Sequence, residues 1–212
     1  MELNPIVLVR YGEIGVKSNR VRVRLENLLI KNIQESLRRG GVLNYSISKA
    51  RGRILVNAPK EDLIKAALMA ARVFGVVSTS PAYSLNFSSI NEITIAAYEL
   101  WRSKVNGRRF AVRVSRTGNH PFTSIDVARR VGAVLYPFSN GVDLDNPEVE
   151  LYVEIRDNYA YLFDEVIYGP GGLPLGSQGG KGLALASGGF DSLVVYWLRG
   201  GGGAWVVDLF CS

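Results

Sequence analysis

The sequence has one cysteine and one histidine among its 212 residues, and it has no long apolar run. The single cysteine, Cys211, excludes an internal disulfide framework and a zinc site built from several cysteines. The single histidine, His120, argues against a catalytic triad with a histidine base. No apolar run reaches the roughly 18–20 residues that a membrane-spanning helix needs, and "PIVLV" near the start is too short for a secretory signal. We therefore expect a soluble cytoplasmic protein with no membrane partner.

Acidic residues are scarce in the first two-thirds of the chain. Residues 1–56 carry 11 Lys and Arg against 4 Asp and Glu, and residues 57–140 carry 11 against 5. Residues 141–212 carry 3 against 10, so the three net charges are +7, +6 and −7, which sum to the +6 of the chain. A basic region of this size is typical of proteins that bind a polyanion, although solvated helix faces would give the same counts.

The first 85 residues predict the element order β-α-β-β-α-β, which is that of a ferredoxin-like unit. An apolar strand over Ile6–Val9 precedes a helix over about Asn19–Arg38, whose leucines and isoleucine recur at helical spacing and whose cap is Ser18. The stretch "YSISKARGRILVNA" predicts two short strands around Ala50–Gly52. A second helix, capped by Asn57, follows, and "VVSTSPAYSLN" predicts the last strand.

The next block, up to residue 168, is also predicted to be mixed α/β. A helix begins after Ser88 or Ser89, and "RRFAVRVSRTG" then alternates apolar residues with arginines, as a half-buried strand does. Ser124 is the predicted cap of the helix that follows. The stretch "DNPEVELYVEIRDNYAYLFDEVIYG" predicts a hairpin with its turn at Asp157–Asn158.

The last part of the chain begins with Gly169–Gly182, whose many glycines and prolines predict a linker or an irregular crossing between domains. Beyond it, "LALA", "SGGFDS", "LVVYWLRG" and "AWVVDLF" predict a buried strand, a turn, a helix and a second buried strand. This order is the start of a parallel α/β unit.

The turn "SGGFDS" has the features of a phosphate-binding loop. Glycines between a strand and a helix present free backbone N–H groups to an anion, and Gly188 and Gly189 permit its close approach. Asp191 is explained if it binds a Mg²⁺ ion carried by a nucleotide. The loop lacks the lysine of a Walker motif. The alternative is a tight connection in which the glycines serve packing and Asp191 caps the helix.

Five stretches resemble one enzyme family, and they follow the same order along the chain. "SGGFDS" is similar to the pyrophosphate loop, SGGxDS, of the adenine-nucleotide α-hydrolase superfamily, whose members split ATP between the α and β phosphates. "RYGEIGVKSNR" resembles the opening of the tRNA 4-thiouridine sulfurtransferases. "RRFAVRVSRTGNHPFTSIDVARRVGAVL" with "VDLDNPEVELYVEIRDNYAYLF" resembles their THUMP domain, an RNA-binding module, and "YGPGGLPLGSQGG" resembles the segment that joins THUMP to the loop. The resemblance runs from about Val7 to Ser212.

The resemblance implies an α+β chain with a ferredoxin-like domain, an α/β THUMP domain and the first β-α-β of an adenine-nucleotide α-hydrolase-like parallel sheet. It places the ferredoxin-like domain at residues 1–58, extending to about 85 if elements are shared, and the THUMP domain at 59–168. Residues 169–182 form the linker, and residues 183–212 form a truncated start of the pyrophosphate-loop domain.

The implied reaction is the ATP- and Mg²⁺-dependent adenylation of a tRNA uridine. Sulfur from a persulfide, supplied by a cysteine desulfurase or another donor, then gives 4-thiouridine, and some members also serve thiamine biosynthesis. Family members are often homodimers. Asp191 is the implied catalytic residue, and Cys211 stands apart from the family's persulfide cysteine. The resemblance implies ATP contacts at Leu185, Ala186, Ser187, Gly188, Gly189, Phe190, Asp191, Ser192, Phe210 and Cys211.

The candidate RNA contacts are mostly arginines, because a guanidinium can fork onto a phosphate. Each of them alone is equally well explained as an ordinary exposed side chain. His120 lies in a loop before Pro121, and this position favours a surface or RNA-stacking role for its side chain. The residues expected to form one basic face are Lys104, Arg108, Arg109, Arg113, Arg116, Arg129 and Arg130. A second patch is expected from Arg20, Arg22 and Arg24.

Three functions remain open on these grounds. In the first, the chain is the tRNA-binding part of a sulfurtransferase and is catalytically incomplete by itself. In the second, it is a short THUMP protein that presents tRNA to a separate catalytic partner. A metabolic ATP-dependent ligase would bind ATP without tRNA, which the basic first two-thirds of the chain argue against.

Overall fold

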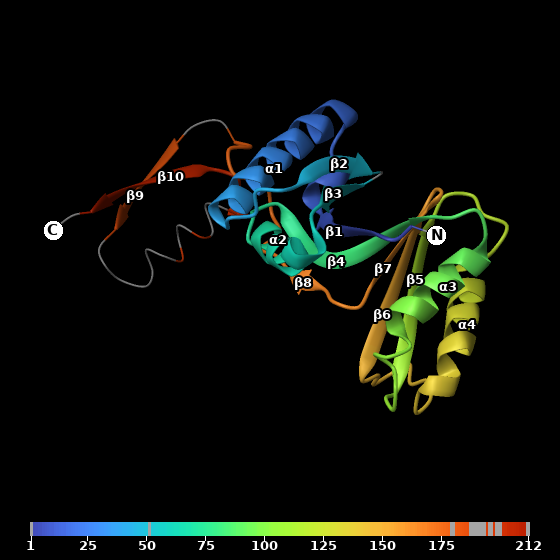
Figure 1. The fold of residues 1–212 in the computed structure, drawn as a ribbon. Coiled ribbons are helices and arrows are strands. Elements are labelled where there is room, and N and C mark those ends of the chain that lie inside the picture. Colours follow the sequence, from blue (N-terminus) through green and yellow to red (C-terminus); the bar gives the residue numbers. More distant parts are fainter. Residues whose placement is uncertain are drawn as a thin grey trace. The chain divides into compact units, whose positions relative to one another are not determined.

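The computed structural model describes residues 2–50, 52–178, 181–186, 194, 197 and 201–210, with backbone only for 181–186 and 205–210. The chain forms two compact units (Figure 1). We call Val7–Thr79 with Val166–Ser212 the α1/α2 unit, and Met1–Ile6 with Ser80–Glu165 the α3/α4 unit. The boundary runs through two strands, β1 and β4, so each of them contributes residues to both units.

The α1/α2 unit has the predicted β-α-β-β-α-β order. Its strands pair in the order β2-β3-β1-β4, and a short strand, β8, pairs with β4. Short 3-10 helices, Glu13–Val16 and Lys60–Asp62, precede α1 and α2. The elements are β1 (Asn4–Tyr11), α1 (Asn19–Arg39), β2 (Ser46–Ala50), β3 (Arg53–Asn57), α2 (Leu63–Ala71), β4 (Val76–Asn86) and β8 (Ile167–Tyr168).

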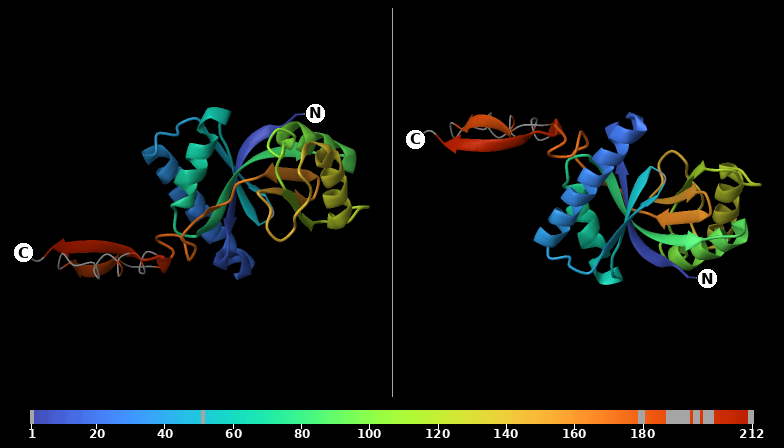
Figure 2. Two further views of the ribbon diagram at one scale, coloured as in Figure 1. Left: turned by 90° about the horizontal axis from the view of Figure 1, so that it is seen from below. Right: turned by 90° about the horizontal axis from the view of Figure 1, so that it is seen from above.

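The core of this unit forms where α1 covers the strands. Leu25, Leu29, Ile33 and Leu37 recur every fourth residue and are buried, so α1 turns one apolar stripe toward the interior. Val7 and Val9 of β1 belong to the same core. Figure 2 shows α1 and α2 beside each other on the strands of this unit. The predicted bounds of α1 are confirmed to within one residue. Ser18 takes the predicted N-cap position, where its side chain makes no capping hydrogen bond.

The prediction that Asn57 caps α2 is wrong. Asn57 is the last residue of β3, where its side-chain amide donates a hydrogen bond to the Ser46 hydroxyl on β2. The α-helix begins at Leu63, after the 3-10 turn that opens at Lys60. Ladder pairing with β2 therefore keeps Asn57 in an extended conformation, and the chain turns later than the sequence pattern indicated.

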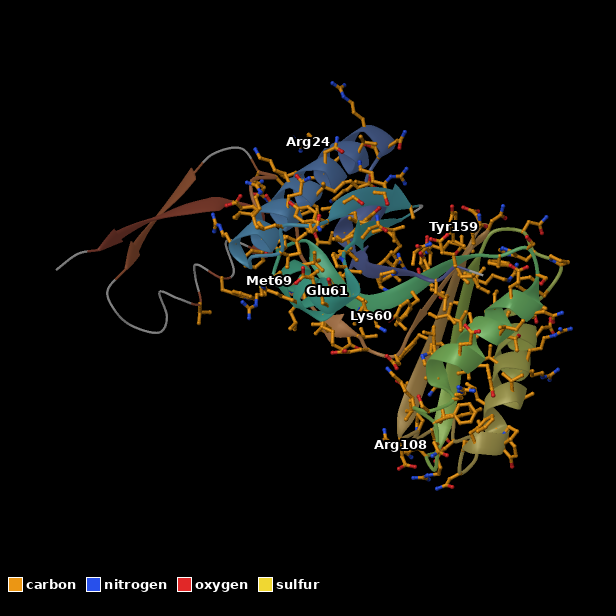
Figure 3. The ribbon with its side chains drawn as sticks, viewed as in Figure 1. Arg24, Lys60, Glu61, Met69, Arg108 and Tyr159 are labelled. Atoms are coloured by element: carbon orange, nitrogen blue, oxygen red, sulfur yellow. The ribbon has the colours of Figure 1, made fainter. Side chains whose placement is uncertain are left out.

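The α3/α4 unit has two helices on one face of a sheet ordered β4-β7-β6-β5. β5 and β6 are parallel, and the other pairs are antiparallel. Figure 3 labels Arg108 and Tyr159, which lie at opposite ends of this unit. The elements are α3 (Ile90–Trp101), β5 (Phe110–Thr117), α4 (Ser124–Leu135), a 3-10 helix (Tyr136–Phe138), β6 (Val149–Arg156) and β7 (Tyr159–Phe163).

The hairpin between β6 and β7 turns where the sequence predicted. Arg156 pairs with Tyr159, which leaves Asp157 and Asn158 as the turn. Asp157 has φ 49°, the left-handed conformation that aspartate and asparagine tolerate better than most residues. The short polar pair therefore sets the register of the hairpin.

The glycine-rich segment after β8 is hydrogen-bonded to β4 and to α1 in its described part, residues 169–178. Gly169 N donates to Val77 O at 2.9 Å, and Gly171 N donates to Val76 O at 2.8 Å. The Asn32 side chain on α1 donates to Leu175 O at 3.0 Å. Residues 169–175 are thus anchored to β4 and α1.

The predicted parallel pair at the end of the chain is present. β9 (Lys181–Ala186) and β10 (Trp205–Phe210) pair in parallel. Within the described part of the chain, no helix is both long and apolar enough to cross a membrane.

Candidate nucleic-acid interface

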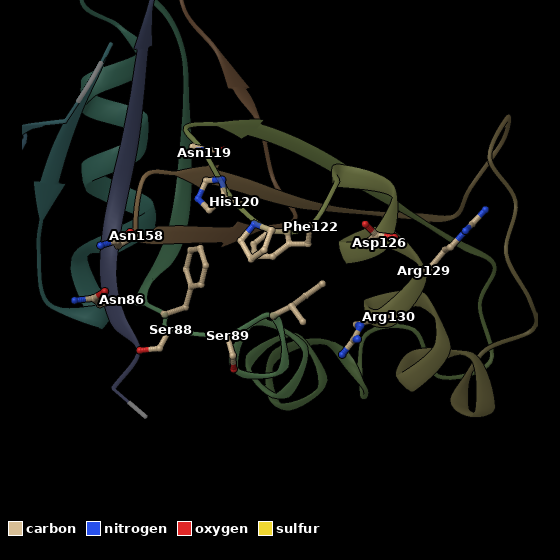
Figure 4. Close-up of a pocket in the computed structure, with 13 residues that line it drawn as sticks. Asn86, Ser88, Ser89, Asn119, His120, Phe122, Asp126, Arg129, Arg130 and Asn158 are labelled. Carbon is tan, nitrogen blue, oxygen red and sulfur yellow. The ribbon is translucent and has the colours of Figure 1, made fainter.

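A pocket of about 850 Å³ opens at one end of the α3/α4 unit. Its walls come from the end of β4, the start of α3, the loop before α4 and the first turns of α4 (Figure 4). The turn of the β6–β7 hairpin adds Asn158. Segments that are distant in sequence therefore meet here. The lining residues are Asn86, Phe87, Ser88, Ser89, Ile90, Asn119, His120, Pro121, Phe122, Asp126, Arg129, Arg130 and Asn158.

Three aromatic rings form one wall of the pocket. The rings of His120 and Phe122 stack with centroids 5.2 Å apart and planes 30° apart. His120 and Phe87 stack at 5.9 Å and 28°, and Phe87 and Phe122 meet at 6.1 Å with a tilt of 52°. Phe87 is buried, whereas His120 and Phe122 are half-buried. The ring surface that stays accessible can stack on an unpaired base of a nucleic acid.

Two hydrogen bonds hold the His120 ring in place. Its Nδ1 lies 3.1 Å from Arg116 Nη1, and its Nε2 lies 2.6 Å from the main-chain oxygen of Asp157. Because an arginine only donates and a carbonyl only accepts, this pairing assigns the neutral ring a proton on Nε2. Gly118 has φ 112°, and a Cβ there would lie 3.1 Å from the His120 ring. Glycine at this position therefore lets the loop fold under the ring.

The loop ends in a capping box that starts α4. The Thr123 hydroxyl accepts a hydrogen bond from Asp126 N at 3.2 Å, and the Asp126 carboxylate accepts one from Thr123 N at 2.8 Å. The helix thus begins with Thr123 as its cap, where we had predicted Ser124. The hydrogen bonds from the Thr123 main chain and hydroxyl hold the pKa of the Asp126 carboxyl below its ordinary value.

Arg129 and Arg130 follow one turn later and give the pocket its positive charge. Both side chains are exposed. Arg130 Nη1 donates to the Asn91 side chain on α3 at 2.7 Å, whereas Arg129 extends away from His120 and Phe122 (Figure 4). Positive charge beside aromatic rings is the combination that single-stranded nucleic acids require.

The other predicted arginines do not join this face. Arg116 bonds the His120 ring and also donates to Gly118 O at 3.2 Å. Arg113 donates to the Glu150 carboxylate at 3.1 Å and to Leu144 O at 2.7 Å. The hydrogen bond from Tyr152, and then that from Arg113, lower the pKa of the Glu150 carboxyl.

A second group of predicted RNA contacts lies at the opposite end of β5. Arg109 is exposed and pairs with Asp143 at 2.8 Å and with Glu148 at 3.6 Å. Lys104 pairs with Asp164, and Arg108 lies at the same end of the unit (Figure 3). Carboxylates from the acidic stretch after residue 141 thus partly neutralise this end. Only Arg129 and Arg130 line the pocket, and this differs from the single face we had expected. The other five lie at the far end of β5 or bond within the protein, namely Lys104, Arg108, Arg109, Arg113 and Arg116.

The proposed second patch lies at the first turns of α1. Arg20 and Arg24 are exposed, and Arg22 donates to the Asn19 side chain at 2.9 Å and lies 3.9 Å from the Glu26 carboxylate. Arg20 and Arg24 are four positions apart on α1 and share one face of the helix, whereas Arg22 lies on another face. All three belong to the α1/α2 unit.

Most of the predicted ATP contacts lie outside the described residues, namely Ser187–Ser192 and Cys211, and so does the catalytic candidate Asp191. Leu185 and Ala186 end β9, and Phe210 ends β10. Ala186 and Phe210 pair in register, so the predicted strand ends meet at one edge of the pair. In α/β sheets this carboxyl edge is where ligands bind.

Sequence reasoning missed the neutral part of the pocket. Phe87, Ser88, Phe122 and Asn158 line it beside the predicted His120, Arg129 and Arg130. The sequence carried one usable signal, because two aromatic residues and an asparagine surround Pro121 in a loop before a basic helix. Nothing in the local pattern indicated that the end of β4 and the hairpin turn would join them.

Comparison with known proteins assigns both halves of the chain. Residues 6–80 match the ThiI ferredoxin-like domain, and residues 87–165 match the THUMP domain. A tRNA sulfurtransferase of Pyrobaculum aerophilum is 45% identical over 207 residues, which cover 98% of this chain and 42% of that protein. A probable tRNA sulfurtransferase of Aeropyrum pernix is 46% identical over 200 residues, covering 93% and 50%. The chain thus spans about half the length of these curated relatives.

Solved structures agree with this assignment. The crystal structure of PH1313 from Pyrococcus horikoshii aligns with a TM-score of 0.84 and 33% identity, covering 97% of this chain and 68% of the other. A 4-thiouridine synthetase in complex with RNA and bound ATP aligns with a TM-score of 0.77 and 25% identity, covering 98% and 52%. The chain described here belongs to the tRNA sulfurtransferase family, of which it carries the ferredoxin-like and THUMP domains.

Proposed function

We propose that this chain is the tRNA-binding part of a tRNA 4-thiouridine sulfurtransferase, and that the pocket of the α3/α4 unit holds an unpaired stretch of the tRNA. The observation that carries the proposal is the stacked wall of His120 and Phe122 beside Arg129 and Arg130. Rings take bases by stacking, and the guanidinium groups take the phosphates that join them.

The family supports the choice of RNA. Its THUMP match, residues 87–165, covers every residue that lines the pocket except Asn86, and a related synthetase has been solved with RNA. In this proposal Arg20 and Arg24 on α1 contact a further part of the tRNA backbone. Lys104 and Arg109 contribute less to tRNA binding, because carboxylates of the protein already pair with their charges.

ATP belongs to the proposed reaction at the carboxyl ends of β9 and β10. ATP with Mg²⁺ would activate the uridine oxygen as an adenylate, and a persulfide donor would supply the sulfur. The parallel pairing of Ala186 with Phe210 fits a nucleotide site at this edge. Residues Ser187–Ser192 would hold the phosphates. We propose that this chain by itself binds tRNA without completing the thiolation.

The test is tRNA affinity over a salt series. Arg129→Gln combined with Arg130→Gln should weaken tRNA binding about tenfold and reduce the salt slope by about one for each phosphate that the variant no longer neutralises. The matched control is Arg38→Gln combined with Arg39→Gln. It removes the same charge from the end of α1, where both arginines pair with Glu35. Equal losses in the two double variants would show that general charge, and not the pocket, binds the tRNA.

A second measurement addresses the enzyme. The purified chain, incubated with tRNA, ATP, Mg²⁺ and a persulfide donor, should form no 4-thiouridine while it binds tRNA. Formation of 4-thiouridine by this chain alone would contradict the division of labour that we propose.

A further inference from the structure

Arg116 lies on the core-facing side of β5, which is an unusual place for an arginine. Side chains alternate between the two faces of a strand, so Arg116 shares its face with Phe110, Val112 and Val114. These three side chains belong to the core of the α3/α4 unit or pack against it. Arg116 is half-buried at the end of this row. A charged group in such a place needs hydrogen-bond partners within the protein.

The Arg116 guanidinium finds its partners in the loop before α4. Its Nη1 lies 3.1 Å from His120 Nδ1 and donates to Gly118 O at 3.2 Å. Both acceptors are neutral groups, because the His120 ring carries its proton on Nε2. One arginine therefore closes the loop and fixes the orientation of the ring.

The His120 ring has no nitrogen left for a ligand. Nδ1 accepts from Arg116, and Nε2 donates to the main-chain oxygen of Asp157. The residue is nevertheless only half-buried and lines the pocket, so part of its ring surface stays accessible there. A nucleic acid can meet this ring by stacking on its face, whereas the nitrogens at its edge are already bonded.

Arg116 itself is poorly placed to bind a phosphate. The described residues that line the pocket include Arg129 and Arg130 and do not include Arg116. Arg129 and Arg130 are exposed, whereas Nε of Arg116 is buried and its Nη1 is bonded to the loop. The sequence predicted a direct RNA contact at Arg116. These contacts instead give it a role that passes through His120.

We propose that Arg116 is a positioning residue of the pocket, which holds His120 so that the ring offers its face to an unpaired base of the tRNA. This role rests on the proposed function, since it requires the tRNA in the pocket. Without a donor at Nδ1 the ring is free to turn away from Phe122 and Phe87, on which it stacks. Loss of Arg116 then weakens binding without changing the number of phosphates that the protein contacts.

tRNA affinity over a salt series separates an indirect role from a direct one. Arg116→Met should weaken binding about tenfold at every salt concentration, the loss expected when one base loses its stacking surface. The slope of log K against log salt should stay within about 0.3 of the parent, whereas a lost phosphate contact reduces it by about one. Arg116→Lys keeps a donor and should bind within about threefold of the parent. Arg113→Met removes the same charge from the other face of β5 and should bind within about twofold.

A double-mutant cycle tests whether Arg116 acts through His120. His120→Phe keeps a ring in the pocket and has no nitrogen for Arg116 to hold. In that background Arg116→Met should change tRNA affinity by less than about twofold. Circular dichroism and melting temperatures show that each variant is folded under the binding conditions. The same loss of about tenfold in both backgrounds would contradict the proposal.

A spectroscopic test needs no tRNA. Because His120 is the one histidine of the chain, ¹⁵N-labelled histidine in the protein without an affinity tag reports on this ring alone. At about pH 8, where an imidazole is ordinarily neutral, Nε2 should be protonated and Nδ1 should be a hydrogen-bonded acceptor. The Nδ1 resonance should shift in Arg116→Met and stay near its parent position in Arg116→Lys. An unchanged Nδ1 resonance in Arg116→Met would overturn the role of Arg116.

The outcomes distinguish a failure at Arg116 from a failure of the proposed function. If Arg129→Gln with Arg130→Gln weakens tRNA binding and Arg116→Met does not, the pocket binds tRNA and the role of Arg116 is wrong. If neither variant weakens binding, the tRNA lies elsewhere and both proposals fail. A salt slope reduced by about one in Arg116→Met would make Arg116 a direct phosphate contact, which also overturns its positioning role.

Discussion

His120 Nε2 lies 2.6 Å from the main-chain oxygen of Asp157, and this contact ties the loop before α4 to the turn of the β6–β7 hairpin. The two residues are 37 positions apart in the sequence. The ring of His120 also stacks on Phe122, so one side chain both closes the end of the sheet and forms the wall of the pocket.

His120→Phe should therefore destabilise the α3/α4 unit while keeping an aromatic ring in the pocket. The variant leaves Arg116 and the Asp157 carbonyl without their partner, which should cost about 1–3 kcal/mol of unfolding free energy. Urea unfolding followed by tryptophan fluorescence measures this, because Trp101 is buried in the same unit. Asn119→Ala, at the exposed neighbour, is the control and should change the stability by less than about 0.5 kcal/mol. Equal stability of His120→Phe and the parent would contradict the role of the two hydrogen bonds.

Thr123→Ala should remove the cap of α4 and cost about 1 kcal/mol of unfolding free energy. Ser124→Ala, one residue later, should be nearly neutral, because the hydroxyl that bonds to Asp126 N belongs to Thr123. The two melting temperatures compare these residues directly. The reverse ranking would restore Ser124 as the cap.

The acid dependence of stability should change in Asp126→Asn. The folded state lowers the pKa of this carboxyl, so its ionised form contributes stability above the unfolded pKa of about 3.9. That contribution should be lost as pH falls through the lower folded pKa. Urea midpoints between about pH 7 and 2 should show the parent more stable than the variant at neutral pH, with the two converging in acid. The exposed Glu99→Gln variant on α3 controls for net charge, and parallel curves for the parent and Asp126→Asn would refute the linkage.

Gly169→Ala should loosen the segment that follows β8. A Cβ at this position would lie 2.4 Å from Val76 O and 2.7 Å from Ala71 O, so the backbone has to move. We expect a loss of about 2 kcal/mol and faster hydrogen exchange at Gly171 N, which bonds Val76 O.

Gly171→Ala is its matched control. Gly171 has φ 66° with no atom near its Cβ position. Alanine there should cost only the roughly 1 kcal/mol that a residue with a Cβ loses in the left-handed conformation. If Gly169→Ala proves no more costly than Gly171→Ala, close packing is not the reason for glycine at position 169.

Local patterns were sufficient for most elements of the fold. The four-residue recurrence from Leu25 to Leu37 predicted α1, and the Asp157–Asn158 pair predicted the hairpin turn. The helix caps were less predictable. Asn57 and Ser124 have suitable side chains, but the N-cap position of α2 is Asp62 and that of α4 is Thr123. Ladder pairing and the capping box select among candidates that look alike in the sequence.

The residues of the candidate site were also predictable only in part. The sequence indicated His120, Arg129 and Arg130, because a basic helix follows an aromatic loop. It could not separate them from Arg109 and Lys104, whose carboxylate partners lie 34 to 60 positions away. Ion pairing across such separations depends on strand order, which residue patterns do not encode locally.

The amino-acid sequence by itself determined the element order, the basic character of the first two-thirds and the family, because these depend on local periodicity, composition and contiguous motifs. The tertiary structure decided which arginines face the pocket and where the glycine-rich segment is anchored. Each of these depends on contacts between residues that are distant along the chain, and only the folded backbone brings them within bonding distance.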